Sequence, residues 1–174
     1  MPKEGTTIGD AVRGAREYVR THPDEARYTD SAAIARVQAG LLVRVEGPGE
    51  TSLISDMPPS VGGTGNAPSP GWFLRAGHAA CVATLIAMRA AEEAVSLTRL
   101  EVVVDSKSDD RGILGAADDV PAGPLSTSVR IAVAAVGVAD DRLREIASWG
   151  VKHCPVDDAV RRAVPVKVEI SVSD

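Results

Sequence analysis

Two cysteines and one histidine are the residues of this sequence best suited to chemistry. Cys81 lies in the middle of an uncharged stretch, residues 76–88, and His78 precedes it by three positions. Cys154 lies in a His-Cys-Pro-Val motif at residues 153–156. A thiolate can attack a peroxide or a disulfide, and it can also bind a metal. The first question is therefore whether these thiols react or only pack.

The surroundings of Cys81 leave both roles open. Leu74, His78, Cys81, Leu85 and Met88 follow one another in steps of four and three, which places them on one face of a helix. A buried free cysteine behaves as a small hydrophobic residue. Cys81 also lies about three turns beyond the expected helix start, where the helix dipole has faded. A reactive Cys81 therefore needs a neighbouring cation to stabilise its thiolate.

Cys154 has a different local environment. It precedes Pro155 at the expected start of a helical turn, where free N–H groups favour a thiolate, whereas Asp157 and Asp158 oppose it. A metal site would require His78 and Cys81 to converge with His153 and Cys154. Adjacent residues rarely both reach one tetrahedral ion, and Cys-x-x-Cys spacing is absent. The pattern therefore disfavours a metal, and we expect none.

Local patterns predict the elements that must position these thiols. Ser69 is suited to cap the helix at 69–94, and Pro70 suits its first position because proline lacks the N–H that would be unpaired there. The other expected elements are an amphipathic helix at 7–21, a three-stranded meander at 32–54, a loop at 56–70, strands at 98–108 and 125–137, helices at 139–153 and 154–163, and a closing strand at 164–172. Residues 109–124 show no element.

The order of these elements indicates an α+β fold. Consecutive strands are too closely connected for helical crossovers, so the sheets should be mainly antiparallel. The length of 174 residues fits a single domain, with residues 1–30 as an N-terminal helical extension and 31–174 as the core. We expect the extension to cover a sheet edge or a partner subunit.

Charge and composition disfavour several functional classes. The net charge of −5 is spread over mixed-sign segments, so a basic surface for nucleic acid is not expected. The uncharged run at 76–88 is shorter than the roughly 20 apolar residues of a membrane span, so we expect a buried helix and no membrane contact. Without a secretory signal pattern, the expected location is cytoplasmic, where two cysteines stay free or form a transient bond.

Two separated motifs resemble one known family. Residues 68–81, Pro-Ser-Pro-Gly-Trp-Phe-Leu-Arg-Ala-Gly-His-Ala-Ala-Cys, resemble the start of the central helix in the OsmC/Ohr family of hydroperoxide reductases. The His-Cys-Pro-Val motif at 153–156 resembles that family's second cysteine motif. Gly62-Gly63 and the closing strand at 164–172 agree, and the similarity extends over about residues 31–172.

The resemblance implies an architecture and a reaction. The architecture is an intertwined homodimer, with long central helices packed between curved sheets and each active site at the dimer interface. Cys81 would be the peroxidatic thiolate and Cys154 the resolving thiol of a peroxiredoxin-like enzyme. Its substrate would be an organic hydroperoxide, and an external dithiol would restore both thiols without any cofactor.

The activating groups depart from the family pattern. Ser69-Pro70-Gly71 stands where the family has Asn-Pro-Glu, so the carboxylate that orients an arginine is missing, and the approach loop at 55–70 contains no arginine. Arg44 is our first candidate for a substitute cation, with Arg36 as an alternative. Arg75 lies about 240° around the helix from Cys81, so it should face elsewhere unless it serves the partner.

The start of the predicted helix suggests an apolar substrate pocket. Trp72, with Phe73 and Leu74, would make the entrance more apolar than hydrogen peroxide requires, and His78 is the third residue expected to line the pocket with Trp72 and Phe73. This favours organic hydroperoxides. The alternative is an OsmC-like protein without peroxidase activity, which binds another apolar small molecule or has a structural role and carries poorly activated thiols.

Overall fold

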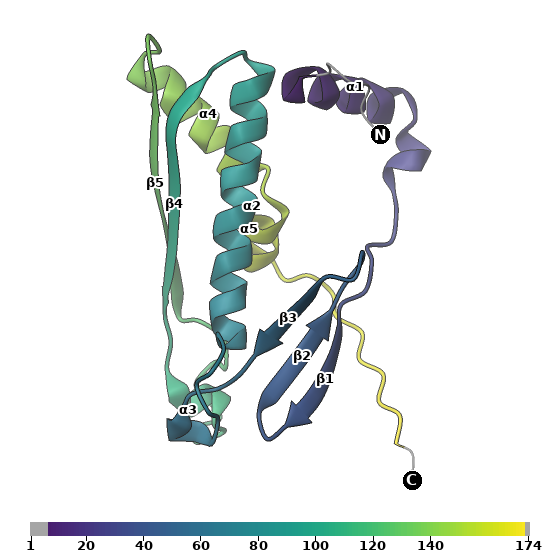
Figure 1. Cartoon of the computed structure of the whole chain (residues 1–174), viewed down its shortest axis with the longest axis vertical. Helices are drawn as coiled ribbons and strands as arrows, with labels where there is room; N and C mark the ends of the chain where they lie inside the picture. The colour runs from purple at the N-terminus through teal and green to yellow at the C-terminus, as the bar shows by residue number, and fades with distance from the viewer. Residues whose placement is uncertain (1–6, 173–174) are drawn as a thin grey trace.

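The computed structural model describes residues 7–172, and one long helix, α2, lies at its centre (Figure 1). Four further helices and two antiparallel sheets are arranged around it within the described residues, so the expected α+β class is confirmed. The helices are α1 (Ile8–Thr21), α2 (Pro70–Glu92), α3 (Asp110–Ile113), α4 (Asp140–Lys152) and α5 (Pro155–Arg161), with 3-10 turns η1 (Pro23–Ala26) and η2 (Pro59–Val61). The strands are β1 (Ile34–Ala39), β2 (Leu42–Glu46), β3 (Ser52–Ser55), β4 (Leu97–Lys107) and β5 (Ser126–Ala135).

Helix α2 begins as its sequence predicts. The Ser69 side chain accepts a hydrogen bond from the backbone N–H of Trp72, and Pro70 occupies the first turn. By length and composition α2 could cross a membrane. In this chain it packs instead against α1, β4, α4 and α5. A central core helix passes the same test of length and hydropathy, so the test does not indicate a membrane protein.

The hydrophobic core lies where α2 crosses α4. Val82, Ile86 and Ala90 of α2 are buried against Ile146 of α4, and Cys154 belongs to the same cluster. Gly150 permits the close approach, because a Cβ there would lie only 2.5 Å from Cγ1 of Ile86. The crossing therefore holds the segment that carries Cys154 beside the helix that carries Cys81.

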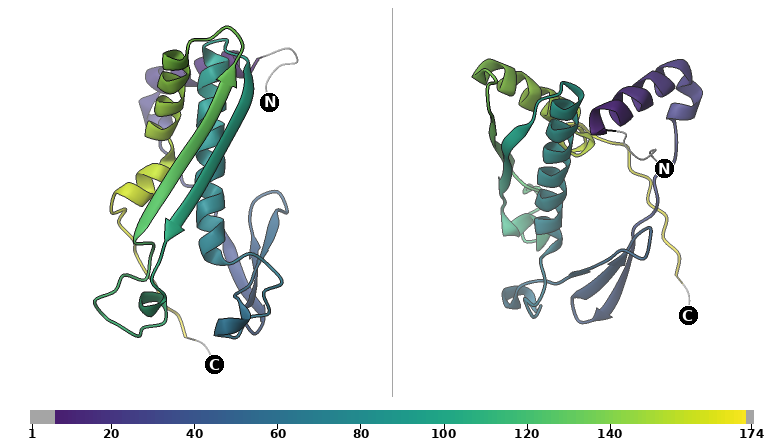
Figure 2. Two further views of the ribbon diagram at one scale, coloured as in Figure 1. Left: turned by 90° about the vertical axis from the view of Figure 1, so that its left-hand side faces the viewer. Right: turned by 45° about the horizontal axis from the view of Figure 1, so that its top comes forward.

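Two separate sheets flank α2. The predicted meander forms an antiparallel sheet in the order β1-β2-β3, and β4 pairs with β5 as a long hairpin whose register runs from Leu97 opposite Ala135 to Lys107 opposite Ser126. The hairpin lies along α2, whereas the meander lies near the start of α2 (Figure 2). Helix α3 was not predicted, because a single turn capped by the Asp109 side chain is too short to show helical periodicity.

The N-terminal helix lies against the C-terminal end of α2, not on a sheet edge as we expected. A Cβ on Gly9 would lie 2.4 Å from the carbonyl oxygen of Ala91, so only glycine allows this approach. Arg13 donates to the backbone carbonyl of Glu92 at 2.8 Å, and Arg16 forms an ion pair with the Glu92 side chain. The extension thus supplies a donor for one of the carbonyls that a helix end leaves unpaired. Its contact with a partner subunit stays a prediction.

The closing strand predicted at 164–172 does not form within the single chain. The segment is extended but belongs to neither sheet, and it leads away from both of them (Figure 1). Val166, Val168, Ile170 and Val172 are 82%, 74%, 84% and 92% exposed. A strand needs an edge to pair with, and this chain brings none alongside the segment. The alternating pattern therefore indicates a strand whose pairing edge is not provided by the same chain.

Candidate active site at the two cysteines

The fold brings the two cysteines together. Cys81 is partly buried on α2, and Cys154 is the fully buried N-cap residue of α5. Cys81 packs against the core cluster that contains Cys154, so the two thiols are neighbours and Cys81 influences the ionisation of Cys154. Both cysteines are free in this structure. Residues far apart in the sequence thus form a dithiol in which one sulfur is partly accessible and the other is enclosed.

The environment of Cys154 keeps its thiol protonated. Burial, followed by the hydrogen bond with Cys81, raises the pKa of the Cys154 thiol above its ordinary value. The backbone N–H of Asp157 donates to the sulfur of Cys154 at 3.3 Å and acts in the opposite direction, but it does not outweigh burial. From the sequence, the N–H groups that favour a Cys154 thiolate and the acidic residues that oppose it were expected nearly to cancel. In the structure the protonated thiol is favoured, because desolvation penalises the charged form.

Alkylation of Cys154 should show this shift directly. In a Cys81→Ser variant we expect iodoacetamide to label folded Cys154 at least about tenfold more slowly at pH 9 than the same chain in urea, because burial still raises the pKa. Since the folded thiol ionises later, its rate should keep rising above the pH where the unfolded chain levels off. Mass spectrometry gives both profiles, and coinciding profiles would contradict the raised pKa.

A second pair of side chains lies beside the dithiol. Nε2 of His78 is 3.1 Å from Oδ1 of Asp157, and both residues are buried. The other carboxylate oxygen of Asp157 accepts a hydrogen bond from Nε of Arg161. His78 precedes Cys81 by one helical turn, and Asp157 follows Cys154 by the same interval, so the two pairs connect the same two segments.

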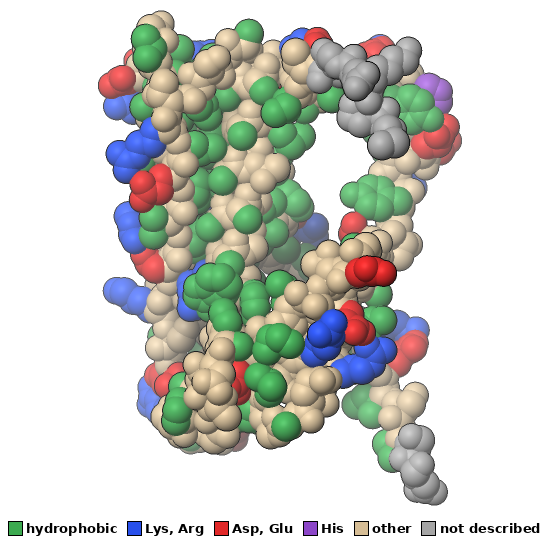
Figure 3. Space-filling model, in the orientation of Figure 1, with side chains coloured by type: hydrophobic (Ala, Val, Ile, Leu, Met, Phe, Trp, Pro, Cys, Tyr) green, Lys and Arg blue, Asp and Glu red, His purple; other side chains and the backbone are tan. Residues whose placement is uncertain are grey.

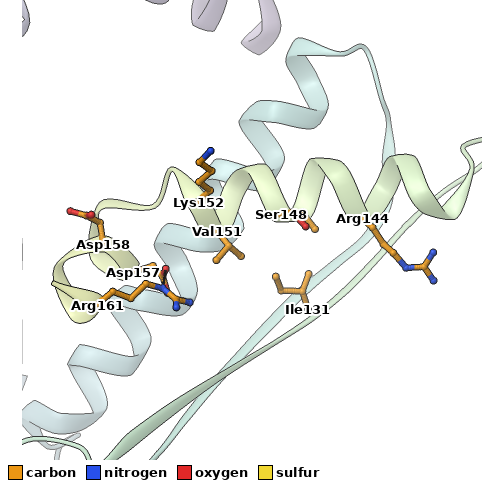
Figure 4. Close-up of a pocket in the computed structure, with 9 residues that line it drawn as sticks. Ile131, Arg144, Ser148, Val151, Lys152, Asp157, Asp158 and Arg161 are labelled. Carbon is orange, nitrogen blue, oxygen red and sulfur yellow. Dashed lines mark hydrogen bonds and ion pairs between the residues drawn. The ribbon is translucent and has the colours of Figure 1, made fainter.

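Cavities open on the hairpin side of this pair. One of about 590 Å³ lies between α4, α5 and β5, where Asp157 and Arg161 point towards each other and Arg144 lies at the far end (Figure 4). A second of about 420 Å³ contains His78 and shares Ile131 and Asp157 with the first. The His78–Asp157 pair therefore borders the second cavity, and Asp157 borders both.

The three predicted pocket residues do not line one pocket in the single chain. Phe73 lines an apolar cavity of about 340 Å³ with residues of the meander, including Val43 and Leu53. Trp72 is exposed and packs edge to face with Phe73 at 5.4 Å between ring centroids. His78 lines the separate cavities near β5. The helix start therefore presents its aromatic residues to the meander, and His78 faces α5.

The candidate cations are engaged elsewhere in this chain. Nε of Arg44 lies 3.1 Å from Glu46, and Arg36 bonds to the same carboxylate across the meander. Arg75 donates to Oγ of Ser106 on β4 at 3.3 Å, so it faces away as its helical position indicated. The role of Arg44 as activating cation stays a prediction.

Comparison with protein families assigns the chain. The model of the OsmC-like protein family matches residues 63–169, which include both cysteines and most of the described fold. The chain belongs to the OsmC-like family. No curated protein matches this OsmC-like chain.

Solved structures support the same fold for this OsmC-like protein. The organic hydroperoxide resistance protein OsmC of Legionella pneumophila is 25% identical, with a TM-score of 0.55 over 81% of this chain and 97% of that chain. The OsmC-like protein of Mycoplasma pneumoniae is 14% identical, with a TM-score of 0.67 over 79% and 91%. The organic hydroperoxide resistance protein OhrB of Bacillus subtilis is 20% identical, with a TM-score of 0.51 over 82% and 98%.

Asp56 organises the approach loop of this OsmC-like chain, and the sequence analysis did not single it out. It is buried at the start of the approach loop and accepts hydrogen bonds from the backbone N–H groups of Met57 and Thr64 at 2.8 and 3.0 Å. The hydrogen bond from the Thr64 side chain is the main cause that lowers the pKa of Asp56. An aspartate directly after a strand, at the entry to a Pro- and Gly-rich loop, is the signal that could have revealed it.

The residues considered for a metal do not converge. The His153 ring stacks on Trp149 at 4.0 Å and bonds its backbone carbonyl, while His78 bonds Asp157. Within residues 7–172, no group of three or more His, Cys, Asp or Glu side chains is arranged to hold a metal. The convergence of His78, Cys81, His153 and Cys154 that a metal site would require is therefore not seen among these residues, and the expectation that no metal is bound stays a prediction.

Proposed function

We propose that this OsmC-like protein reduces organic hydroperoxides through Cys81 and Cys154. The observation that carries the proposal is the contact between a partly accessible thiol and a buried one in an apolar environment. Membership of the family and the likeness to organic hydroperoxide resistance proteins support the substrate class.

The two thiols divide the reaction into two steps. The Cys81 thiolate attacks one peroxide oxygen, the O–O bond breaks, and an alcohol leaves after taking up a proton. Cys81 is then a sulfenic acid. The sulfur of Cys154 displaces its hydroxyl group, which leaves as water with the proton of the Cys154 thiol, and a disulfide forms. An external dithiol reduces this disulfide by exchange and is itself oxidised, so the cycle needs no bound cofactor.

Apolar surface near the helix start supports an organic substrate. The cavity that contains Phe73 is lined by apolar side chains except Ser55, and the neighbouring helix residues Trp72 and Leu74 are exposed. An alkyl or aryl hydroperoxide gains free energy by burying its carbon atoms there, whereas hydrogen peroxide has none to bury. Arg44 would stabilise the thiolate in this proposal, if a partner subunit brings its guanidinium to Cys81.

We propose further that two copies of this chain form an intertwined dimer. The single chain exposes 12829 Å² of surface, about 1.6 times what is typical of a compact monomer of 18.1 kDa. An open passage separates α1 from the meander, with hydrophobic side chains of the α2 region along one side (Figure 3). The excess surface of each chain is more than large enough for its share of an obligate dimer interface, and the unpaired segment 164–172 offers a strand for the second copy.

The direct test is turnover by the purified protein. With dithiothreitol as the dithiol, we expect cumene hydroperoxide to be consumed catalytically and at least about tenfold faster than hydrogen peroxide at equal concentration. The reason is that only the organic peroxide uses the apolar surface. Peroxide loss no faster than with dithiothreitol alone would overturn the proposal.

A binding role is the second candidate, and one observation favours it. Gly71 replaces the family carboxylate, and Arg36, Arg44 and Arg75 are all bonded to other residues in this chain. If the thiols are unreactive, the apolar cavity at Phe73 would bind a small apolar molecule. Quenching of Trp72 fluorescence by such a molecule, in a protein that ignores peroxide, would favour this role over the reductase.

A further inference from the structure

We propose that His78 and Asp157 form a clamp that holds the resolving cysteine opposite Cys81. The clamp deepens the proposed function, on which its catalytic meaning rests. Both are positioning residues, because neither is assigned a bond to the reacting sulfur of Cys81. What they control is how often Cys154 meets the oxidised form of Cys81.

Two pairs of side chains connect α2 with the start of α5. One pair is His78 with Asp157, and the other is Cys81 with Cys154. On α2, His78 and Cys81 are one turn apart and face the same side. At the start of α5, Cys154 caps the helix, and Asp157 is both the next residue on that side and the N–H donor to the Cys154 sulfur. The hydrogen bond between His78 and Asp157 therefore fixes the turn that presents the sulfur of Cys154.

Burial makes the hydrogen bond between His78 and Asp157 costly to break. His78 and Asp157 are 2% and 5% exposed, so breaking their bond would leave polar atoms without water to replace it. A carboxylate can only accept hydrogen bonds, which requires the proton to be on Nε2 of His78. Arg161 occupies the other carboxylate oxygen, so Asp157 is held from two sides. Helix α5 has only seven residues, and such an anchor keeps it from shifting relative to α2.

The clamp matters in the step that forms the disulfide. In that step the S–S bond forms, the S–O bond of the Cys81 sulfenic acid breaks, and water leaves with the proton of the Cys154 thiol. The rate depends on the effective concentration of one sulfur at the other, which the clamp raises by restricting α5. The attack on peroxide by Cys81 precedes this step and does not involve Cys154.

The position of the proton donor provides a sharp test. A glutamine at position 78 places its amide nitrogen near the site of Nε2, whereas an asparagine is one methylene shorter and ends near Nδ1. We therefore expect His78→Gln to keep the clamp and His78→Asn to lose it. Asp158→Asn is the matched control, because Asp158 is exposed and, within residues 7–172, forms its ion pair with Arg162 and not with the clamp.

The measurement is the equilibrium of the Cys81–Cys154 pair with reduced and oxidised glutathione, in which two thiols give one protein disulfide and two reduced glutathiones. In His78→Asn the effective concentration should fall about tenfold, which raises the reduction potential by about 30 mV. His78→Gln and Asp158→Asn should match the wild type. Equal potentials for the Asn and wild-type proteins would overturn the clamp, as would equal losses in Gln and Asn.

A kinetic measurement separates the clamp from the peroxidase. After one equivalent of cumene hydroperoxide, the sulfenic acid trapped by dimedone should persist about tenfold longer in His78→Asn, while the rate of peroxide loss stays within about twofold. Unchanged persistence of the sulfenic acid would count against the clamp.

If the wild type does not react with peroxide but its glutathione equilibrium responds to His78→Asn, the proposed function fails and the clamp stands. If His78→Asn unfolds, Asp157→Asn provides the measurement. Its single amide oxygen can accept from His78 or from Arg161 but not from both, so α5 loses one of its two holds and the reduction potential should rise. An unchanged potential would then overturn the clamp.

Discussion

Replacing Cys81 by serine should lower the rate of cumene hydroperoxide reduction by about a thousandfold or more. A serine hydroxyl is not ionised near neutral pH, so the group that attacks the peroxide oxygen is lost. The change is nearly isosteric at a partly buried position, so the fold and the packing of Cys154 should persist. The rate is measured as peroxide loss in the presence of dithiothreitol, with circular dichroism to confirm the fold.

Cys154→Ser is the matched comparison for this result. It leaves the attacking thiol in place, so one equivalent of peroxide should still be consumed at a near wild-type rate. Steady turnover should fall by about ten- to a hundredfold, because an external thiol must resolve the sulfenic acid. A Cys81→Ser protein that retains turnover, or a Cys154→Ser protein that has lost the first step, would show that the roles assigned here are wrong.

Removal of residues 164–174 should convert the protein from a dimer to a monomer. Val164, Val166, Val168, Ile170 and Val172 alternate along this segment and are exposed in the single chain. In an isolated chain these apolar side chains stay in water and contribute no free energy of burial. Pairing with a sheet edge of a second copy buries them and satisfies the backbone hydrogen bonds of the segment. Light scattering of the full chain and of the chain ending at Ala163 at micromolar concentration measures the change.

Two lysine substitutions at adjacent positions make this prediction specific to one face. Ile170→Lys places a charge on the apolar face and should weaken the dimer about as strongly as the truncation. Glu169→Lys introduces the same side chain on the opposite, polar face and should leave the dimer intact. A full-length protein that is monomeric, or a truncated one that stays dimeric, would refute the role of the segment.

The elements around the site were largely predictable because their signals are local. Ser69 and Pro70 mark the start of α2 through groups within one turn of each other. The meander and the hairpin follow from β-branched residues between Gly-rich turns, and Pro155 marks the start of α5. The two cysteine motifs indicated the family, which the match over residues 63–169 confirms.

The prediction that Trp72, Phe73 and His78 line one substrate pocket was wrong for the single chain, and the reason lies in the tertiary structure. Trp72, Phe73 and His78 lie within two turns of one helix, yet α2 has the meander on one side and α5 on another. Helical periodicity gives the relative directions of side chains, but it does not tell which element covers each direction. The single chain therefore separates the aromatic residues from His78.

The sequence by itself determined most of the helices and strands, apart from α3 and the closing segment, and it indicated a pair of thiols as the reactive groups. Only the tertiary structure decided that Cys154 is enclosed beside Cys81, that His78 bonds Asp157, and that the last apolar segment lacks an edge in its own chain. The reason is physical: caps, turns and periodicity depend on neighbours within a few residues, whereas burial and pairing depend on contacts across the whole fold.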